Sequence, residues 1–216
     1  MITLHDVGKH YRVSNGRYTV LDGVDLQINR GEKLGILGRN GSGKSTLIRL
    51  ISGSELPNRG TIQRSMSVSW PLALSSAFQG SLTGLDNIHF ICRVYAVDPS
   101  RVIPYVEEFS DLGIFLRESV KTYSSGMRAR LAFAISMAVE FDCFLIDEVI
   151  AVGDARFHQK CALELFEKRK DRAMVMVSHD ADNIRKHCAR ACVLHQGRLH
   201  AFDDVEGAFA YYQSCG

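Results

Sequence analysis

The sequence predicts an α/β fold, in which a mainly parallel sheet is combined with antiparallel strands and a helical insert. Short, mainly apolar runs typical of buried parallel strands occur at 33–37, 143–148 and 173–177. Residues 1–32 instead partly alternate apolar and polar side chains between glycines, which favours antiparallel strands. Residues 76–123 carry mostly helical patterns and separate two α/β halves.

The composition excludes some protein classes. The 216 residues are 46% hydrophobic and 23% charged, with a formal net charge of +2, so charge gives no reason to expect a nucleic-acid partner. No apolar run approaches the roughly 20 residues that span a bilayer, and the N-terminus lacks the features of a secretory signal. Six scattered cysteines fit a reducing compartment better than a disulfide framework. We expect a soluble, cytosolic chain, which could be a subunit of a membrane assembly.

The stretch from Gly38 to Ser45 fits the phosphate-binding pattern GxxxxGK[ST] at every specified position. A predicted strand precedes it and a predicted helix opens at Thr46, so consecutive backbone N–H groups can surround a phosphate. We expect Lys44 to reach the β- and γ-phosphates and the Ser45 hydroxyl to ligate Mg²⁺. A chance glycine-rich turn is the alternative. The sequence predicts a nucleoside triphosphate site made of Gly38, Arg39, Asn40, Gly41, Ser42, Gly43, Lys44, Ser45 and Thr46.

Two further apolar strands end in polar residues. Asp147 and Glu148 end the strand that begins at Cys143, and Ser178 and His179 follow the strand at 173–177. Parallel strands end at one edge of a sheet, so we expect these residues near the phosphate loop. Asp147 is then placed near Mg²⁺, Glu148 near the water that it would polarise, and His179 in the site. A solvated loop and a structural histidine are the ordinary alternatives.

Three weaker patterns leave alternatives open. Tyr11 precedes the phosphate loop by about one small β-unit and could stack on adenine, with Tyr18 as the competitor and a packing role nearly as plausible. Ser124-Ser125-Gly126 precedes a helix, and either an anion site or a serine cap produces these letters. Metal-like residue types also cluster without a known zinc spacing, at His187, Cys188, Cys192 and His195, and we expect Cys192 in the core.

The remaining elements follow from periodicity and from glycine and proline positions. We expect strands at 60–63 and 67–70, the latter closed by Pro71, and further strands at 191–194 and 199–202. Helices are expected at 85–97, 99–112, 128–139, 157–170 and 205–212.

In order, the chain contains a phosphate loop, a Gln79 loop, a helical insert, Ser-Ser-Gly before a helix, and strands ending in Asp-Glu and Ser-His. This order resembles the nucleotide-binding subunit of ABC transporters over essentially the whole chain. The stretches 77–84, 123–127 and 146–154 are similar to the ATP-binding subunit of Gram-negative capsular polysaccharide exporters. The resemblance implies one ABC ATPase domain over 1–216. It would have a P-loop NTPase core with an antiparallel β subdomain at about 1–75 and 124–216, and a helical subdomain at about 76–123.

The resemblance also implies a role for each matching residue. Catalysis would involve Lys44, Gln79, Glu148 and His179, with Glu148 as general base, His179 on the γ-phosphate and Gln79 sensing Mg²⁺ and the attacking water. Mg²⁺ would be held by Ser45, Gln79 and Asp147. Tyr11 would stack on adenine. Contacts across a dimer would come from Ser124, Ser125 and Gly126, which would meet the γ-phosphate held by the opposite copy, and from Asp154 in the dimer-contact loop.

The implied protein is an ATPase subunit that uses ATP and Mg²⁺, closes head-to-tail as a homodimer and drives a membrane permease from the cytoplasmic face of a bacterial inner membrane. The permease would dock near Gln79, on an apolar face with Phe90, Ile91, Val94 and Tyr95, although these side chains could equally be helix core. The family pattern Leu-Ser-Gly-Gly-Gln is altered here. Ser125 replaces a glycine and could crowd the γ-phosphate or strain a backbone with positive φ.

Three other functions compete with this interpretation. The nearest is the ATPase of an exporter for O-antigen or teichoic acid. A P-loop kinase would explain Lys44 and Asp147, but not Ser124–Gly126 or His179. A soluble ABC ATPase acting on DNA or ribosomes would be expected to carry two nucleotide domains or a long coiled-coil insert, and the sequence shows neither.

Overall fold

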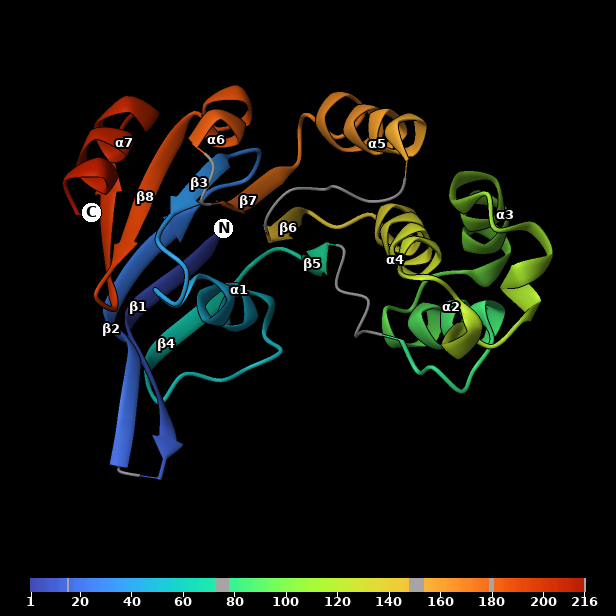
Figure 1. Ribbon diagram of the computed structural model, residues 1–216, viewed down its shortest axis with the longest axis horizontal. Helices are drawn as coiled ribbons and strands as arrows, with labels where there is room; N and C mark the ends of the chain where they lie inside the picture. The colour runs from blue at the N-terminus through green and yellow to red at the C-terminus, as the bar shows by residue number, and fades with distance from the viewer. Residues whose placement is uncertain (15, 73–77, 148–153, 179–180, 216) are drawn as a thin grey trace. The chain divides into compact units, whose positions relative to one another are not determined.

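The computed structural model describes residues 1–14, 16–72, 78–147, 154–178 and 181–215 (Figure 1). The chain forms two compact units, and each is built from separate stretches of sequence. The first comprises Met1–Pro71, Asp142–Val149 and Asp171–Gly216, and holds almost all of two β-sheets. The second comprises Leu72–Phe141 and Ile150–Lys170 and is helical. The mixed α/β organisation with a helical part is as the sequence predicts.

Three antiparallel strands form the smaller sheet, in the order β2-β1-β4. They are β1 (Ile2–Val13), β2 (Gly16–Ile28) and β4 (Arg59–Arg64). Ile2 pairs with Ile28 and Leu4 with Leu26, and all four side chains are buried. The alternation of apolar residues in 1–32 therefore reflects one buried sheet face, and the expected strand at 60–63 is confirmed.

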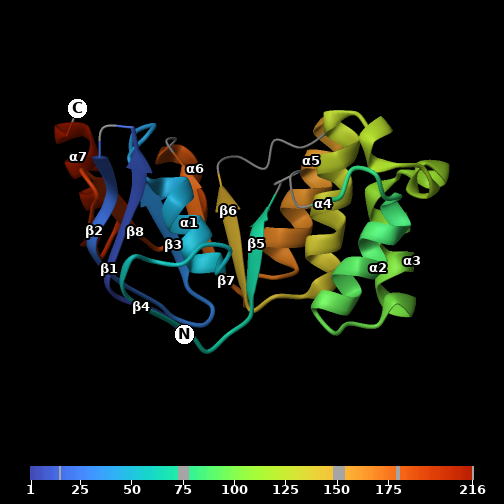
Figure 2. The same cartoon turned by 90° about the horizontal axis from the view of Figure 1, so that it is seen from below.

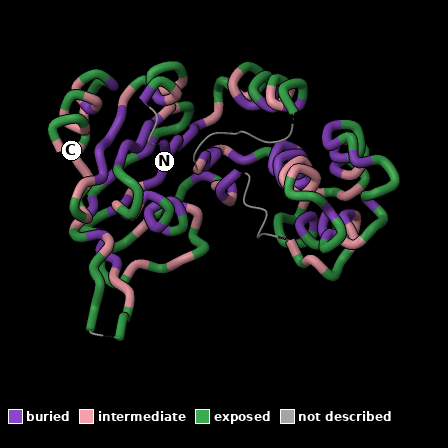
Figure 3. Tube along the Cα trace, in the orientation of Figure 1, coloured by how far each residue is buried: buried purple, intermediate pink, exposed green. Residues whose placement is uncertain are grey.

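The larger sheet has six strands in the order β5-β6-β7-β3-β8-β9. They are β5 (Val68–Leu72), β6 (Cys143–Asp147), β7 (Ala173–Ser178), β3 (Lys33–Leu37), β8 (Arg190–His195) and β9 (Arg198–Phe202). Parallel pairing joins β6, β7, β3 and β8, whereas β9 runs antiparallel to β8. The inner strands are buried along most of their length (Figure 3). Pro71 lies inside β5 rather than after it, because β5 is an edge strand and needs no ladder donor on its outer side.

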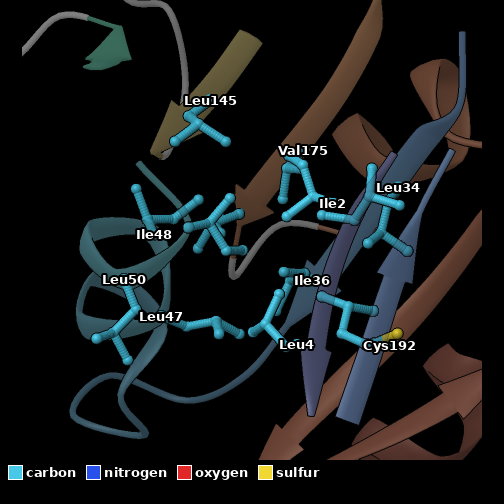
Figure 4. Close-up of a cluster of buried hydrophobic side chains, with 14 of the residues drawn as sticks. Ile2, Leu4, Leu34, Ile36, Leu47, Ile48, Leu50, Leu145, Val175 and Cys192 are labelled. Carbon is cyan, nitrogen blue, oxygen red and sulfur yellow. The ribbon is translucent and has the colours of Figure 1, made fainter. Parts of the chain in front are cut away.

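Helices cover both faces of this sheet. One face carries α1 (Lys44–Ser52), whose Leu47 and Ile48 join a buried cluster with Ile36 of β3 and Leu145 of β6 (Figure 4). The opposite face carries α6 (Ala181–His187) and α7 (Val205–Ser214). There a methyl group at Gly35 would lie 2.4 Å from Ile184, so α6 packs directly against the β3 backbone.

The helical unit contains α2 (Gly84–Val94), α3 (Pro99–Ser110), α4 (Ser125–Val139) and α5 (Ala155–Ala162), of which α2, α3 and α4 pack together (Figure 2). Shorter turns are η2 (Gly113–Arg117), η3 (Val120–Thr122) and η4 (Leu163–Glu167). The unit extends beyond the expected 76–123 because Phe109 of α3 stacks on Phe133 of α4 at 5.7 Å and meets Phe157 of α5 edge-on at 5.6 Å.

Several expected helix ends are displaced. Helix α2 ends at Val94 rather than Val97, and α3 ends at Ser110 rather than Leu112. Left-handed residues follow each helix, Ala96 with φ of 53° and Asp111 with φ of 55°, and such residues stop an α-helix.

Among the residues that the structure describes, no helix has both the length and the hydropathy that a membrane span requires.

Candidate functional site

The loop between β3 and α1 needs glycine at defined positions. Gly41 has φ of 81° and Gly43, at the N-cap of α1, has φ of 105°, both conformations that L side chains rarely adopt. A methyl group at Gly43 would lie 2.7 Å from Val20 Cγ1, and one at Gly38 would lie 2.6 Å from Ser42 Oγ. The loop is therefore held close to its surroundings, and its glycines cannot be exchanged without moving it.

Polar groups converge inside this loop. The Lys44 ammonium is buried and donates to the carbonyl oxygens of Gly38 at 2.6 Å and Arg39 at 3.0 Å. The buried Ser42 hydroxyl has no hydrogen-bond partner among the described residues. A positive charge and an unsatisfied hydroxyl beside the N-terminus of a nine-residue helix fit a bound phosphate group.

A cavity of about 340 Å³ lies over the loop. It brings together the loop, two aromatic side chains and a carboxylate, with a lining of Tyr11, Tyr18, Val20, Asn40, Gly41, Gly43, Lys44, Ser45, Thr46 and Asp147. The Ser45 hydroxyl and the Asp147 carboxylate are hard oxygen donors of the kind that Mg²⁺ prefers, so the residues present fit that ion.

Tyr11 and Tyr18 are cross-strand partners on β1 and β2. The Tyr11 hydroxyl donates to Glu55 Oε2 at 2.9 Å and accepts from Arg49 at 3.3 Å, whereas Tyr18 is 57% exposed. Burial raises the pKa of Glu55, but hydrogen bonds from Lys9, Tyr11 and Arg49 outweigh it, and the pKa is lowered overall. Glu55 is thus a charged anchor for the Tyr11 ring, and both tyrosines stay candidates for adenine.

The strand ends support the predicted catalytic edge. Leu37 of β3 is in register with Ser178 of β7, and Asp147 of β6 is in register with Val177. The three parallel strands therefore end together where the phosphate loop begins, which is the usual ligand edge of such a sheet. Glu148 and His179, the next residues along β6 and β7, lie outside the described residues.

In the helical unit, Gln79 precedes α2. Its Nε2 donates to Ser81 Oγ at 3.3 Å, and its backbone is held by the buried Asn87. Helix α2 exposes Phe90 and Val94, and its C-cap exposes Tyr95, with 55%, 57% and 39% of their surface accessible. Ile91 is only 7% exposed, so its expected place on the outer face was wrong, and it belongs to the interior of the unit.

Helix α4 begins at Ser125, three residues earlier than expected, with Ser124 as its N-cap. The Ser124 hydroxyl accepts from the Met127 N–H at 3.2 Å. Ser125 is the first helical residue and is not among those with positive φ, so the strain considered for a serine there does not arise. A methyl group at Gly126 would meet only Ser124 Oγ, at 3.9 Å, among the described atoms. Nothing described in this chain therefore requires glycine at that position.

Asp154 is tied to two helices. Its Oδ1 accepts from the Phe157 N–H at 2.9 Å and caps α5, while its Oδ2 accepts from Arg130 of α4 at 2.8 Å. The pKa of Asp154 is lowered, mainly by the hydrogen bond from Phe157 and less by Arg130. The start of α5 is thus anchored to the helix that begins at Ser124–Gly126.

The sequence profile of the ABC transporter family matches residues 21–151. The chain belongs to the ABC transporter family. It is 59% identical to "ATP-binding protein BexA" of Haemophilus influenzae, over 98% of both chains. It is also 59% identical to "Capsule polysaccharide export ATP-binding protein CtrD" of Neisseria meningitidis serogroup B, over 99% of both.

A solved ATP-binding cassette, dimeric and in a post-hydrolysis state with ADP and Pi bound, shares the fold. The TM-score is 0.78 at 21% identity, over 94% of this chain and 98% of that one. The predicted ABC ATPase fold is therefore confirmed, and the chain is an ABC transporter ATPase. A P-loop kinase is excluded, because a kinase would not match this family over more than half of its length.

The sequence also offered a cluster of metal-like residue types at His187, Cys188, Cys192 and His195. Cys192 is fully buried in the hydrophobic core, as expected. Across the described part of the chain, no group of three or more histidine, cysteine or acidic residues is arranged to hold a metal ion.

Three residues that hold candidate functional side chains were not found from the sequence: Asn87, Glu55 and Arg130. Asn87 has a visible signal, because it is a polar residue four positions before Ile91, on the apolar side of a predicted helix. Glu55 and Arg130 are exposed-looking charges whose partners are distant in the sequence or lie in an irregular loop, so no local pattern points to them.

Proposed function

We propose that this chain is the ATP-hydrolysing subunit of an ABC exporter that moves capsule polysaccharide across a bacterial inner membrane, working from its cytoplasmic face. The observation that carries the proposal is the 59% identity, over essentially full length, to an ATP-binding protein named for capsule polysaccharide export. The geometry of the cavity over the phosphate loop supports the ATP-binding part.

ATP would bind over the loop between β3 and α1. The loop N–H groups and the Lys44 ammonium would hold the β- and γ-phosphates, and Tyr11 or Tyr18 would stack on the adenine ring. Ser45 and Asp147 would hold Mg²⁺, together with Gln79. When bound, Mg²⁺ would neutralise charge that develops on the phosphate oxygens.

Hydrolysis would then depend on residues at the strand ends. Glu148 would accept a proton from the attacking water, His179 would hold the γ-phosphate, and Gln79 would orient the water. Positioning and electrostatic stabilisation carry most of phosphoryl transfer, so small displacements of these groups control the rate.

We further propose that two copies close head-to-tail around two ATP molecules. Ser124, Ser125 and Gly126 of one copy would face the γ-phosphate held by the other, with Asp154 near the same interface. The free space around Gly126 supports this role, because a residue with no internal need for glycine can owe it to an external ligand that approaches closely. The dimeric state of a structural relative is consistent with it.

The membrane permease would meet α2 through Phe90, Val94 and Tyr95. Phe90 and Val94 are four residues apart and thus share one helix face, and both are more than half exposed. Exposed neighbouring apolar side chains are typical of a docking surface.

The dimer is tested by size-exclusion chromatography of Glu148→Gln with Mg-ATP, beside the wild type and Lys44→Ala. Glu148→Gln should bind ATP but not hydrolyse it, so a dimer should accumulate in that variant alone. A chain that stays monomeric while it turns over ATP would contradict the shared site.

The cargo is tested in cells that lack this chain and its permease, supplied with both and with labelled capsule, O-antigen or teichoic acid precursors. Surface appearance of capsule alone supports the proposal, whereas export of another glycan alone overturns it.

In the same cells, Phe90→Ser with Val94→Ser should abolish co-purification with the permease. Ile114→Ser, at an 81% exposed apolar residue of the same unit, is the matched control.

A further inference from the structure

Asn87 is a buried amide in the first turn of α2, and only 2% of its surface is exposed. Its Oδ1 accepts from the Gln79 N–H at 3.0 Å. Its Nδ2 donates to the Gln79 carbonyl at 3.3 Å and to the Thr83 carbonyl at 2.8 Å. Both polar atoms of the amide are therefore used, and one side chain holds both backbone groups of Gln79.

The side chain of Gln79 is held far less firmly than its backbone. Among the described residues, Nε2 makes one hydrogen bond, to Ser81 Oγ at 3.3 Å, and both residues are exposed. The Gln79 carbonyl also accepts from the Leu82 N–H at 3.1 Å, which adds to the restraint on the backbone. Gln79 thus has a side chain that can turn on a fixed base.

The base is fixed to a well-formed helix. Thr83 Oγ1 accepts from the Asp86 N–H at 3.0 Å and Asp86 Oδ2 accepts from the Thr83 N–H at 3.2 Å, a reciprocal cap at the start of α2. Asn87 lies in the same turn, and Ile88 and Ile91 bury the helix in the unit. Any movement of α2 as a rigid helix therefore carries the Gln79 backbone with it.

We propose that Asn87 is a positioning residue for ATP hydrolysis, which holds the Gln79 backbone to α2 and places the glutamine side chain for its role at Mg²⁺ and the attacking water. The proposal rests on the role proposed above for Gln79. The exposed residues Phe90 and Val94 lie one and two turns beyond Asn87 on the same helix, so α2 links them to the Gln79 backbone.

The test is a double-mutant cycle of ATPase kinetics on the purified full chain, with Asn87→Ala, Gln79→Ala and the double variant. Misplacing a catalytic group by about 1 Å can cost about 100-fold, so for Asn87→Ala we expect kcat to fall about tenfold. KM for ATP should stay within about twofold, because the described hydrogen-bond partners of the Asn87 side chain are Gln79 and Thr83, and neither belongs to the phosphate loop. The double variant should be no slower than Gln79→Ala. Asn87 would act only by placing the Gln79 side chain, and Gln79→Ala has already removed that side chain.

Asp98→Ala is the matched control. It removes the side-chain cap of α3 in the same unit, where the Asp98 carboxylate accepts from the Ser100 N–H at 2.9 Å, and it changes no described partner of Asn87 or Gln79. It should therefore lower the unfolding midpoint of the chain while leaving kcat unchanged. A purely structural role for Asn87 would give equal kcat values for the two variants at matched midpoints, and that result would overturn the proposal.

The cycle also separates the two proposals. If Gln79→Ala itself leaves kcat unchanged, the proposed role of Gln79 fails. If Gln79→Ala is slow while Asn87→Ala is as fast as the wild type, only the positioning role of Asn87 fails. Additive losses in the double variant would likewise contradict it, because they would show that Asn87 acts independently of Gln79.

Discussion

The two units of this protein hold their functional groups in different ways. In the nucleotide unit the phosphate loop is shaped by its backbone, because Gly41 and Gly43 adopt positive φ and three parallel strands end at the same edge. In the helical unit, Gln79 and Asp154 are placed by hydrogen bonds with the side chains of Asn87 and Arg130, which lie on the helices α2 and α4. Backbone placement depends on local sequence, whereas side-chain placement depends on partners that only the fold brings together.

The sharpest way to break the backbone-shaped loop is Gly43→Ala. The new methyl group would meet Val20 at 2.7 Å and force a positive φ on alanine, so the loop must move. We expect ATP affinity to fall about 100-fold, equivalent to losing one or two charge-assisted hydrogen bonds. Isothermal titration with a non-hydrolysable analogue measures it. The control is Gly16→Ala, where φ is also positive but no described atom outside the adjoining residues lies within 4 Å of the new methyl group, and affinity there should be unchanged.

The side-chain-held unit is best broken at its buried ion cluster. Glu164 pairs with Arg169 at 2.7 Å, with only 6% and 12% of the two side chains exposed, and Arg169 also donates to the Met137 carbonyl at 2.9 Å. Arg169→Met leaves Glu164 with the more exposed Lys168, so we expect a loss of about 2 kcal/mol, below the roughly 3–5 kcal/mol of a fully orphaned charge. Denaturant unfolding measures it, and ATP affinity in the other unit should not change. A loss no larger than that of the exposed control Arg101→Met would contradict the role of the cluster.

The same ion cluster makes the stability of the helical unit depend on pH. Burial raises the pKa of Glu164, but hydrogen bonds from Lys168, Arg169 and Tyr105 outweigh it, so its pKa lies below the ordinary 4.5. A lowered pKa contributes stability that is present above 4.5 and is lost as the pH falls through the folded value. Glu164→Gln should therefore have a lower Tm than the wild type at neutral pH, and this difference should shrink as the pH drops below 4.5. A difference that stays constant with pH would show that the carboxylate charge does not matter.

The smallest effect is expected at the exposed end of the unit, for Arg130→Lys. Asp154 is 63% exposed, so solvent screens its ion pair with Arg130, and the Tm should change by less than in the Glu164 variant. If Arg130 places Asp154 for the dimer, adding Arg130→Lys to the Glu148→Gln variant should weaken its nucleotide-driven dimerisation, while Tm should hardly change. Equal dimerisation with and without the change would show that Arg130 does not place Asp154 for the dimer.

This contrast explains what the sequence revealed. The strand at 33–37 was predicted with its observed bounds, the strand that begins at Cys143 was predicted with its observed start, and the loop from Gly38 to Ser45 was recognised, because apolar runs and glycine spacing are local signals. The antiparallel strands and the family were predicted correctly for the same reason.

The parts that were missed depend on distant contacts. Ile91 was placed on the wrong face, since helix periodicity alone does not say which side of α2 meets α3 and α4. The helical unit contains more residues than the expected 76–123, because Phe109 stacks on Phe133 and meets Phe157 edge-on. These contacts join segments that are separated along the chain. Asn87 was not singled out, because its partner Gln79 lies in a loop without periodicity.

The central position of β3 has a consequence for how the protein is made. Its two neighbours in the sheet, β7 and β8, begin only at Ala173 and Arg190. A ribosome therefore releases the phosphate loop long before the strands that flank it, and the apolar β3 segment must wait unpaired. Such late, long-range pairing is slow and leaves apolar strands open to aggregation or chaperone capture. A partly synthesised chain therefore contains the phosphate-loop sequence before it can form the sheet edge that holds the loop in its folded conformation.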